Sequence, residues 1–223
     1  MKVEIYSDIA CPWCYIGKRR FERALASFPA ADEVEVVFRP YQLDPAAPVQ
    51  GTPLLPSLER KFGPRHRQMT AHVGEQARAE GLAFDWQIAI AANTFDAHRL
   101  LWLAEREGGT TLQHAVAEQL FDAHFSRGVD VGDRGQLAEV ATRAGLDRDR
   151  VAAFLASGEG AAETRAAIDE ARALGISGVP AFVFDERYLV SGAQPASVFL
   201  QALEQVTRET AAADACADDA CAM

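Results

Sequence analysis

The sequence predicts an α/β fold that is interrupted by a mostly helical insertion. Short stretches with the alternating apolar pattern of β-strands lie near both ends of the chain, and helical periodicity dominates the middle. Hydrophobic residues make up 49% of the 223 residues, which suffices to bury a substantial core and excludes disorder for most of the chain. The expected organisation is one α/β domain that carries a second, helical domain within it.

The first 45 residues predict a β-α-β unit. Residues 2–7 alternate as a strand does, and a helical pattern follows through Phe28. Pro12 suits the first turn of that helix, where its missing N–H would have no partner anyway, and this places Cys11 at or next to the N-cap. Residues 34–38 predict a second strand, which an extended segment follows.

The middle of the chain, residues 57–174, has a helical pattern that glycine-rich breaks divide. The α/β pattern then resumes. Two apolar strands are expected at 179–184 and 188–190, and a last helix is expected to run from Pro195 to about Glu209.

These elements define the predicted domains. Residues 1–56 and 175–210 form a discontinuous α/β domain, and residues 57–174 form the inserted helical domain. Residues 211–223 are rich in Ala and Asp and have no periodic apolar face. We therefore expect them to form a mobile tail.

The charge balance limits the partners. Lys and Arg number 22 against 32 Asp and Glu, which gives a formal net charge of -10. Such an excess of acids repels phosphate groups, so neither nucleic acid nor an anionic membrane is an expected partner. No apolar run reaches the roughly 18 residues that span a bilayer. The expected location is the cytoplasm.

Four cysteines form two close pairs, Cys11 with Cys14 and Cys216 with Cys221. Each pair would close only a very short loop, so neither would stabilise the fold much as a disulfide. In a cytosol that keeps most thiols reduced, such pairs are typical of redox catalysis, redox sensing or metal binding.

The position of the first pair favours redox chemistry. A thiol at a helix N-terminus faces the positive end of the helix dipole and unpaired backbone N–H groups, which favour the thiolate, so Cys11 is the expected nucleophile. Cys14 lies one turn deeper and is the expected resolving thiol. Between them, Pro12 stiffens the turn, and Trp13 offers an apolar surface for a bound peptide.

Zinc binding is the main alternative for this pair. Zinc normally takes four ligands, and a second cysteine pair occurs only in the tail, with a different spacing. The strand-helix context matches a redox motif better. The sequence contains no nucleotide or metal motif, so no cofactor is expected.

Several segments together resemble the FrnE-like branch of the DsbA-like thioredoxin-fold oxidoreductases. The resemblance covers about residues 1–210, with the motifs in the expected order and spacing. The segments that carry it are Ser7-Asp8-Ile9-Ala10-Cys11-Pro12-Trp13-Cys14-Tyr15-Ile16-Gly17, Asn93-Thr94-Phe95-Asp96-Ala97-His98-Arg99-Leu100, Gly178-Val179-Pro180-Ala181-Phe182 and Ser191-Gly192-Ala193-Gln194-Pro195.

The resemblance implies a thioredoxin fold with an inserted helical domain. The expected activity is thiol-disulfide exchange with protein or peptide substrates, and glutathione is a further candidate partner. The resemblance also implies that Cys11 is the nucleophile, that Cys14 resolves, and that Pro180 belongs to a cis-proline loop facing them. From the residues alone a trans bond is the default. A cis bond would turn the backbone of Val179 toward Cys11, where it could pair with an extended substrate.

Four further residues are candidates. The resemblance places Asn93 and Gln194 near the groove as substrate contacts and suggests His98 as a further contact, although ordinary packing also explains them. Asp8 is either a proton acceptor or a polar group of the loop. The other histidines are interpreted as core or surface residues: His66, His72, His114 and His124.

The tail pair has three interpretations: an inert appendage, a metal ligand pair, or a second redox couple that exchanges with Cys11 and Cys14. About seven extended residues beyond Glu209 would reach roughly 25 Å, so exchange is geometrically feasible. We therefore hypothesise that Cys216 and Cys221 shuttle electrons to the first pair or shield it.

Two other functions are weighed against the oxidoreductase. One is a glutathione-dependent isomerase or transferase, because 2-hydroxychromene-2-carboxylate isomerases and kappa-class glutathione transferases look like relatives of this branch. These typically have Ser at the position of Cys11. The other is a non-enzymatic metal-binding or chaperone-like protein that uses both cysteine pairs.

Overall fold

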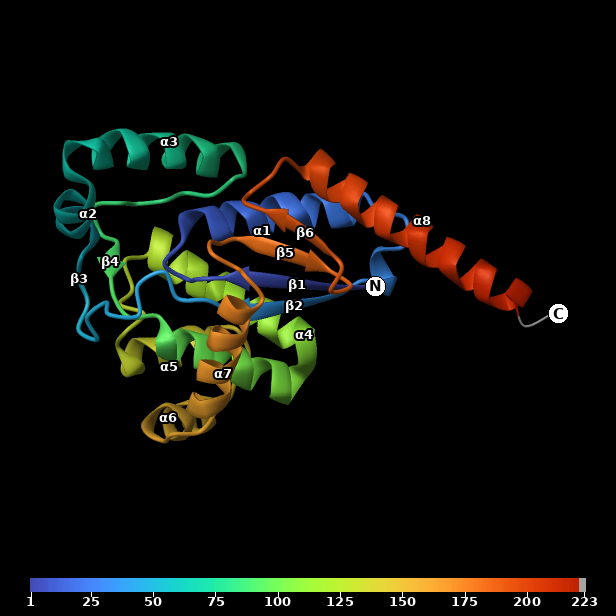
Figure 1. Cartoon of the computed structure of the whole chain (residues 1–223). Coiled ribbons are helices and arrows are strands. Elements are labelled where there is room, and N and C mark those ends of the chain that lie inside the picture. The colour runs from blue at the N-terminus through green and yellow to red at the C-terminus, as the bar shows by residue number, and fades with distance from the viewer. Residues whose placement is uncertain (221–223) are drawn as a thin grey trace.

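A computed structural model describes the backbone of residues 1–220 and the side chains of residues 1–210. Its centre is a four-stranded sheet in the order β2-β1-β5-β6 (Figure 1). Strand β1 pairs in parallel with β2 and antiparallel with β5, which pairs antiparallel with β6. The strands are β1 (Lys2–Ser7), β2 (Glu35–Pro40), β5 (Ala181–Phe184) and β6 (Tyr188–Ser191). The predicted α/β class is confirmed.

Helices cover both faces of this sheet. Figure 1 shows α1 (Pro12–Ala26) and α8 (Ala196–Ala220) on one face, and α4 (Phe95–Ser126) and α7 (Ala161–Ala173) on the other. On the first face the ring of Phe21 lies 5.4 Å from that of Phe182 and 5.6 Å from that of Phe199. This aromatic cluster fixes α1 against the middle of the sheet.

The segment between β2 and β5 is mostly helical, as predicted. It begins a few residues early, and it contains an unexpected two-stranded antiparallel ladder, β3 (Thr52–Pro53) with β4 (Ile90–Ala91). One of the predicted glycine-rich breaks, Gly108-Gly109, is a kink within α4, where Gly109 has φ 66°. No helix in residues 1–220 has both the length and the apolar character needed to cross a bilayer. The remaining helices are α2 (Leu54–Phe62), α3 (His66–Ala79), α5 (Arg134–Arg143) and α6 (Arg148–Ala156), with 3-10 turns at Ala31–Glu33 and Gly63–Arg65.

The last helix is longer than the sequence predicts. The predicted helix ended at about Glu209, before the segment that we expected to be a mobile tail, whereas α8 continues past Glu209 to Ala220. Alanine has the highest helix propensity, and extending a helix already nucleated by its packed first turns needs no apolar face. Cys216 therefore lies on α8, and Cys221 lies outside the described residues.

Candidate active site

Cys11 is the N-cap of α1, as the sequence predicts. Its backbone is extended (φ -94°, ψ 111°), and Pro12 occupies the first helical turn. The N–H of Cys11 donates to the carbonyl of Asp8 at 3.0 Å, and the N–H of Cys14 donates to the carbonyl of Cys11 at 3.0 Å. These bonds hold the Cys11 side chain at the positive end of the helix dipole.

The two thiols are free and differ in environment. Cys11 is 4% exposed and borders a cavity, whereas Cys14 is 1% exposed. Burial raises the pKa of the Cys14 thiol well above its usual range, and the hydrogen bond to Cys11 and the negative charges of Cys11 and Asp8 raise this pKa further. Cys14 is therefore held protonated while the sulfur of Cys11 faces the cavity.

The loop before β5 faces Cys11. The Val179-Pro180 peptide bond is cis, as the resemblance implied. The Cys11 thiol donates to the carbonyl oxygen of Val179 at 3.6 Å. A Cβ on Gly17 of α1 would lie 3.1 Å from Cγ of Pro180 and 3.4 Å from the ring of Phe182. The absence of a side chain at Gly17 thus lets α1 and this loop approach closely.

Asp8 lies buried at the end of β1, next to Cys14. Its carboxylate accepts hydrogen bonds from the N–H of Leu43 at 2.7 Å and of Ala10 at 3.3 Å, and Nε2 of His98 lies 3.4 Å away. Burial by itself would raise the pKa of Asp8, but these contacts, above all with His98, outweigh burial and lower it. Asp8 is therefore ionised at neutral pH.

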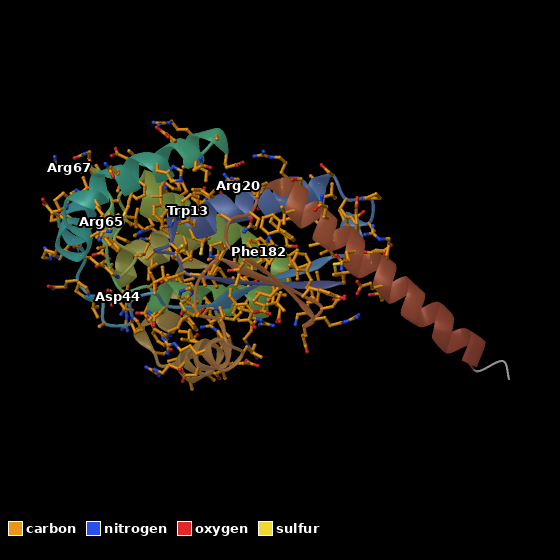
Figure 2. The ribbon with its side chains drawn as sticks, turned by 45° about the horizontal axis from the view of Figure 1, so that its top comes forward. Trp13, Arg20, Asp44, Arg65, Arg67 and Phe182 are labelled. Carbon is orange, nitrogen blue, oxygen red and sulfur yellow. The ribbon has the colours of Figure 1, made fainter. Side chains whose placement is uncertain are left out.

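A cavity of about 740 Å³ opens beside Cys11. Pro12, Trp13 and Val179 line its base, and α2 and α3 form its far wall. In Figure 2, Trp13 lies at the end of α1 that faces the turn between these two helices. Leu43 and Met69 are about half exposed within it. The site thus joins the sulfur of Cys11 to an apolar groove of the size that ligand sites have.

His124 is a cavity residue that sequence reasoning missed. It is 1% exposed, it lines the cavity, and neither ring nitrogen has a hydrogen-bond partner in the described part of the chain. Burial lowers its pKa to about 4, so the ring is neutral. No local sequence signal distinguishes it, because it lies on a long helix between apolar neighbours. His66, also expected to be structural, lines the same cavity.

Asn93 and Gln194 do not line this cavity. Nδ2 of Asn93 donates to the carbonyls of Pro45 and Ala47 at 3.0 and 3.2 Å, and its Oδ1 accepts from the N–H of Phe95 at 2.9 Å. It fastens a loop and borders a second cavity of about 450 Å³. Asn93 directly precedes Thr94, which is the N-cap of α4. Gln194 is exposed and donates to the carbonyl of Ser191 at 2.9 Å.

One protein family and several known proteins are similar to this chain over most of its length. The model of the DSBA-like thioredoxin domain family matches residues 2–204. The chain is similar to the crystal structure of a probable DsbA oxidoreductase from Streptomyces coelicolor, with 47% identity and a TM-score of 0.86 over 94% of this chain and 91% of that chain. It shares its fold with the cytosolic disulfide reductase DsbM from Pseudomonas aeruginosa, solved with GSH, at 20% identity and a TM-score of 0.65 over 93% and 100% of the two chains. A curated relative, YwbO of Bacillus subtilis, is 26% identical over 210 residues, which are 90% of this chain and 94% of YwbO.

Proposed function

This chain belongs to the DSBA-like thioredoxin domain family, and from that membership we propose that it exchanges disulfides with protein or peptide substrates through Cys11 and Cys14. One observation carries the proposal. The sulfur of Cys11 lies at the N-terminus of α1, beside the carbonyl of Val179 and an apolar cavity, with Cys14 buried one turn deeper. A nucleophilic thiol, a resolving thiol and a peptide-sized groove are the parts that disulfide exchange requires.

The proposed reaction has two steps. The Cys11 thiolate attacks one sulfur of a substrate disulfide, which forms a mixed disulfide and releases the first substrate thiolate. The Cys14 thiol then loses its proton and attacks the Cys11 sulfur, which forms the Cys11–Cys14 disulfide and releases the second substrate thiolate. The substrate is reduced and the protein is oxidised. Two equivalents of an external thiol such as glutathione then restore the dithiol and leave as their own disulfide. The same steps in reverse oxidise a substrate.

Backbone pairing would hold the substrate. The Val179 carbonyl now accepts from the Cys11 thiol, and this contact is lost when Cys11 enters a mixed disulfide. That carbonyl then becomes available to an N–H of an extended substrate segment. Pro12 and Trp13 would contact the same segment from the other side.

The proposal also covers the branch of the family, the location of the protein in the cell and the direction of the disulfide exchange. The motifs around Cys11 and Pro180 support membership of the FrnE-like branch. The similarity to a cytosolic disulfide reductase supports a cytoplasmic location and reduction or isomerisation as the direction. The same neighbour, solved with GSH, supports glutathione as a partner.

The second cysteine pair remains a proposed redox partner of the first. Helix α8 has 25 residues, so it extends about 37 Å, and in Figure 1 its far end lies away from the N-terminus of α1. Exchange within one chain therefore requires the last turns of α8 to unwind, whereas exchange between two chains does not. A Cys14→Ser variant tests the idea: a trapped disulfide between Cys11 and Cys216 or Cys221 is expected, and its absence would refute the exchange.

The alternatives fit less well. A glutathione-dependent isomerase or transferase would activate glutathione without forming a disulfide to it, and a pair of adjacent cysteines works against that chemistry. A metal-binding protein that uses both cysteine pairs would have to bring Cys216 and Cys221 to Cys11 and Cys14, because zinc normally takes four ligands.

A glutathione redox titration tests the proposal. Purified protein is equilibrated at stepped ratios of reduced to oxidised glutathione, alkylated and mapped by mass spectrometry, so that each cysteine pair is scored separately. We expect a reversible Cys11–Cys14 couple, whose potential relative to the cytosolic pool gives the direction. A pair that stays reduced or unresponsive at every ratio would remove the oxidoreductase proposal.

A further inference from the structure

The cavity beside Cys11 has one wall of unusual charge. The end of α2, the turn after it and the start of α3 carry Arg60, Lys61, Arg65 and Arg67, all exposed, and of these Arg60 and Lys61 line the cavity. Glu59 is the one acid between residues 57 and 67. The chain as a whole has a net charge of -10, so this segment opposes the overall charge. Figure 2 shows Arg65 and Arg67 at the junction of α2 and α3, which the Trp13 end of α1 faces.

These four cations have no carboxylate partner within the described residues. Nη2 of Arg60 donates to Oγ of Ser57 at 3.0 Å, and Nζ of Lys61 lies 5.7 Å from the centre of the Phe62 ring. Elsewhere the arginines are largely neutralised: Arg20 contacts Glu80 at 2.7 Å, and Arg150 contacts Glu159 at 2.6 Å. Carboxylates of the described residues therefore do not neutralise the positive charges of this wall.

The charge is also placed where a substrate would pass. Arg60 and Lys61 line the same cavity as Cys11, together with the half-exposed Met69. Asp44 is the one exposed acid among the lining residues, and it follows Leu43 on a different segment. The groove thus offers apolar contact along its length and positive charge on its α2 side.

We propose that this wall selects substrates, so that the preferred disulfides lie in partly apolar segments with acidic residues next to the cysteine. The inference rests on the proposed disulfide exchange and names its substrate class. The acidic side chains would face Arg60 and Lys61, while an apolar side chain would contact Trp13 and Met69. Long-range charge acts in the opposite sense, because a net charge of -10 attracts cationic peptides. Faster reaction of acidic peptides would therefore indicate local recognition by Arg60 and Lys61, whereas faster reaction of cationic peptides would indicate attraction by the net charge of the chain.

Three peptides test the proposal. Each holds one intramolecular disulfide and one leucine, and they differ only in two positions beside the attacked cysteine, which are both Asp, both Asn or both Lys. The readout is the second-order rate at which each peptide oxidises the Cys11–Cys14 dithiol, followed by alkylation and mass mapping in a Cys216→Ser, Cys221→Ser background. We expect the rates to fall from Asp to Asn to Lys, with about a tenfold span at low salt, the size that two exposed ion pairs permit. The span should shrink at high salt.

Matched variants assign the effect to the wall. The double variant Arg60→Glu, Lys61→Glu should reverse the order of the three peptides. The control is Arg143→Glu, Arg148→Glu, which makes the same change in net charge on exposed residues of α5 and the start of α6. This control should keep the order. The proposal is overturned if the Lys peptide is fastest in the unmodified chain, or if both double variants change the order equally. If no peptide oxidises the dithiol, the proposed exchange itself fails. Equal, measurable rates for all three peptides would instead refute only the preference for acidic segments.

Discussion

Nε2 of His98 lies 3.4 Å from Oδ1 of Asp8, and both side chains are buried. This contact lowers the pKa of Asp8 against the effect of burial, so a negative charge persists in the core next to Cys14. That charge helps to raise the pKa of Cys14. In the proposed exchange, the Asp8–His98 pair would therefore help to distinguish two cysteines that are only three residues apart, because the charge of Asp8 favours the protonated form of Cys14.

Asp8→Asn should lower the pKa of Cys14. The substitution keeps the shape of the side chain and removes the charge that disfavours a Cys14 thiolate. The measurement is the rate of Cys14 alkylation against pH in a Cys11→Ser background, with and without the substitution. Asp44→Asn is the matched control, because this exposed carboxylate borders the same cavity.

The opposite outcome would have a clear meaning. If Asp8→Asn made Cys14 less reactive and mixed disulfides accumulated during turnover, Asp8 would be a proton acceptor for Cys14. That role requires Asp8 to take up a proton readily, which its lowered pKa disfavours.

Cys11 should react with iodoacetamide before Cys14. Both thiols are largely buried, but Cys11 lies at the helix N-terminus and borders the cavity, whereas burial and the Cys11 contact raise the pKa of Cys14. We expect Cys14 to react at least about tenfold more slowly at pH 7. Timed quenching and peptide mass mapping give both rates in one experiment. Faster labelling of Cys14 would contradict the assignment of the nucleophile.

Gly17→Ala should impair the site. The added Cβ would lie 3.1 Å from Cγ of Pro180 and 3.4 Å from the Phe182 ring, so α1 or the Pro180 loop must shift. Overpacking of this kind costs about 1–3 kcal/mol of unfolding free energy. Urea unfolding measures this cost, and the rate of dithiol oxidation by a peptide disulfide should also fall.

Gly178→Ala is the control for that substitution. Gly178 is close to Pro180 in sequence, but a Cβ there meets no atom within 4 Å. We expect wild-type stability and rate. Equal losses in both variants would mean that the effect comes from the loss of a glycine near the loop, not from the contact between α1 and Pro180.

Local signals predicted the parts of the site that lie within one segment. The alternation of residues 2–7 and the position of Pro12 sufficed to place Cys11 at the N-cap of α1. The cis bond before Pro180 needed the family resemblance, since a trans bond is the default for an isolated X-Pro pair. Here the order of motifs along the chain carried information that no single segment held.

Contacts between distant segments could not be predicted in this way. Asn93 lies in a motif that the resemblance placed at the groove, yet its amide is used to fasten the loop at Pro45, some 48 residues away. His124 of α4 lines the cavity together with Asp8 and Ala10 of the loop after β1. Neither outcome follows from helical spacing, because both depend on how segments far apart in the chain pack against each other.

His124 should make the protein less stable in mild acid. Its pKa lies at about 4 in the folded protein, below its ordinary value of 6.5, because the buried ring has no partner for a second proton. The unfolded chain therefore binds a proton that the folded chain does not between pH 6.5 and pH 4. The neutral ring of His124 therefore makes its full contribution to the free energy of unfolding above pH 6.5. That free energy falls by about 3 kcal/mol in all as the pH falls from 6.5 to 4.

A His124→Leu variant isolates this contribution. Since neither ring nitrogen makes a hydrogen bond within the described residues, an apolar replacement leaves no partner unsatisfied, and stability at pH 7.5 should change little. Urea unfolding at steps from pH 7.5 to pH 4 should then show a shallower fall for His124→Leu than for the unmodified chain, whereas His72→Leu, which removes an exposed histidine, should follow the unmodified chain. Parallel curves for all three proteins would mean that the ring of His124 takes up a proton as readily in the folded chain as in the unfolded chain, which would contradict the prediction.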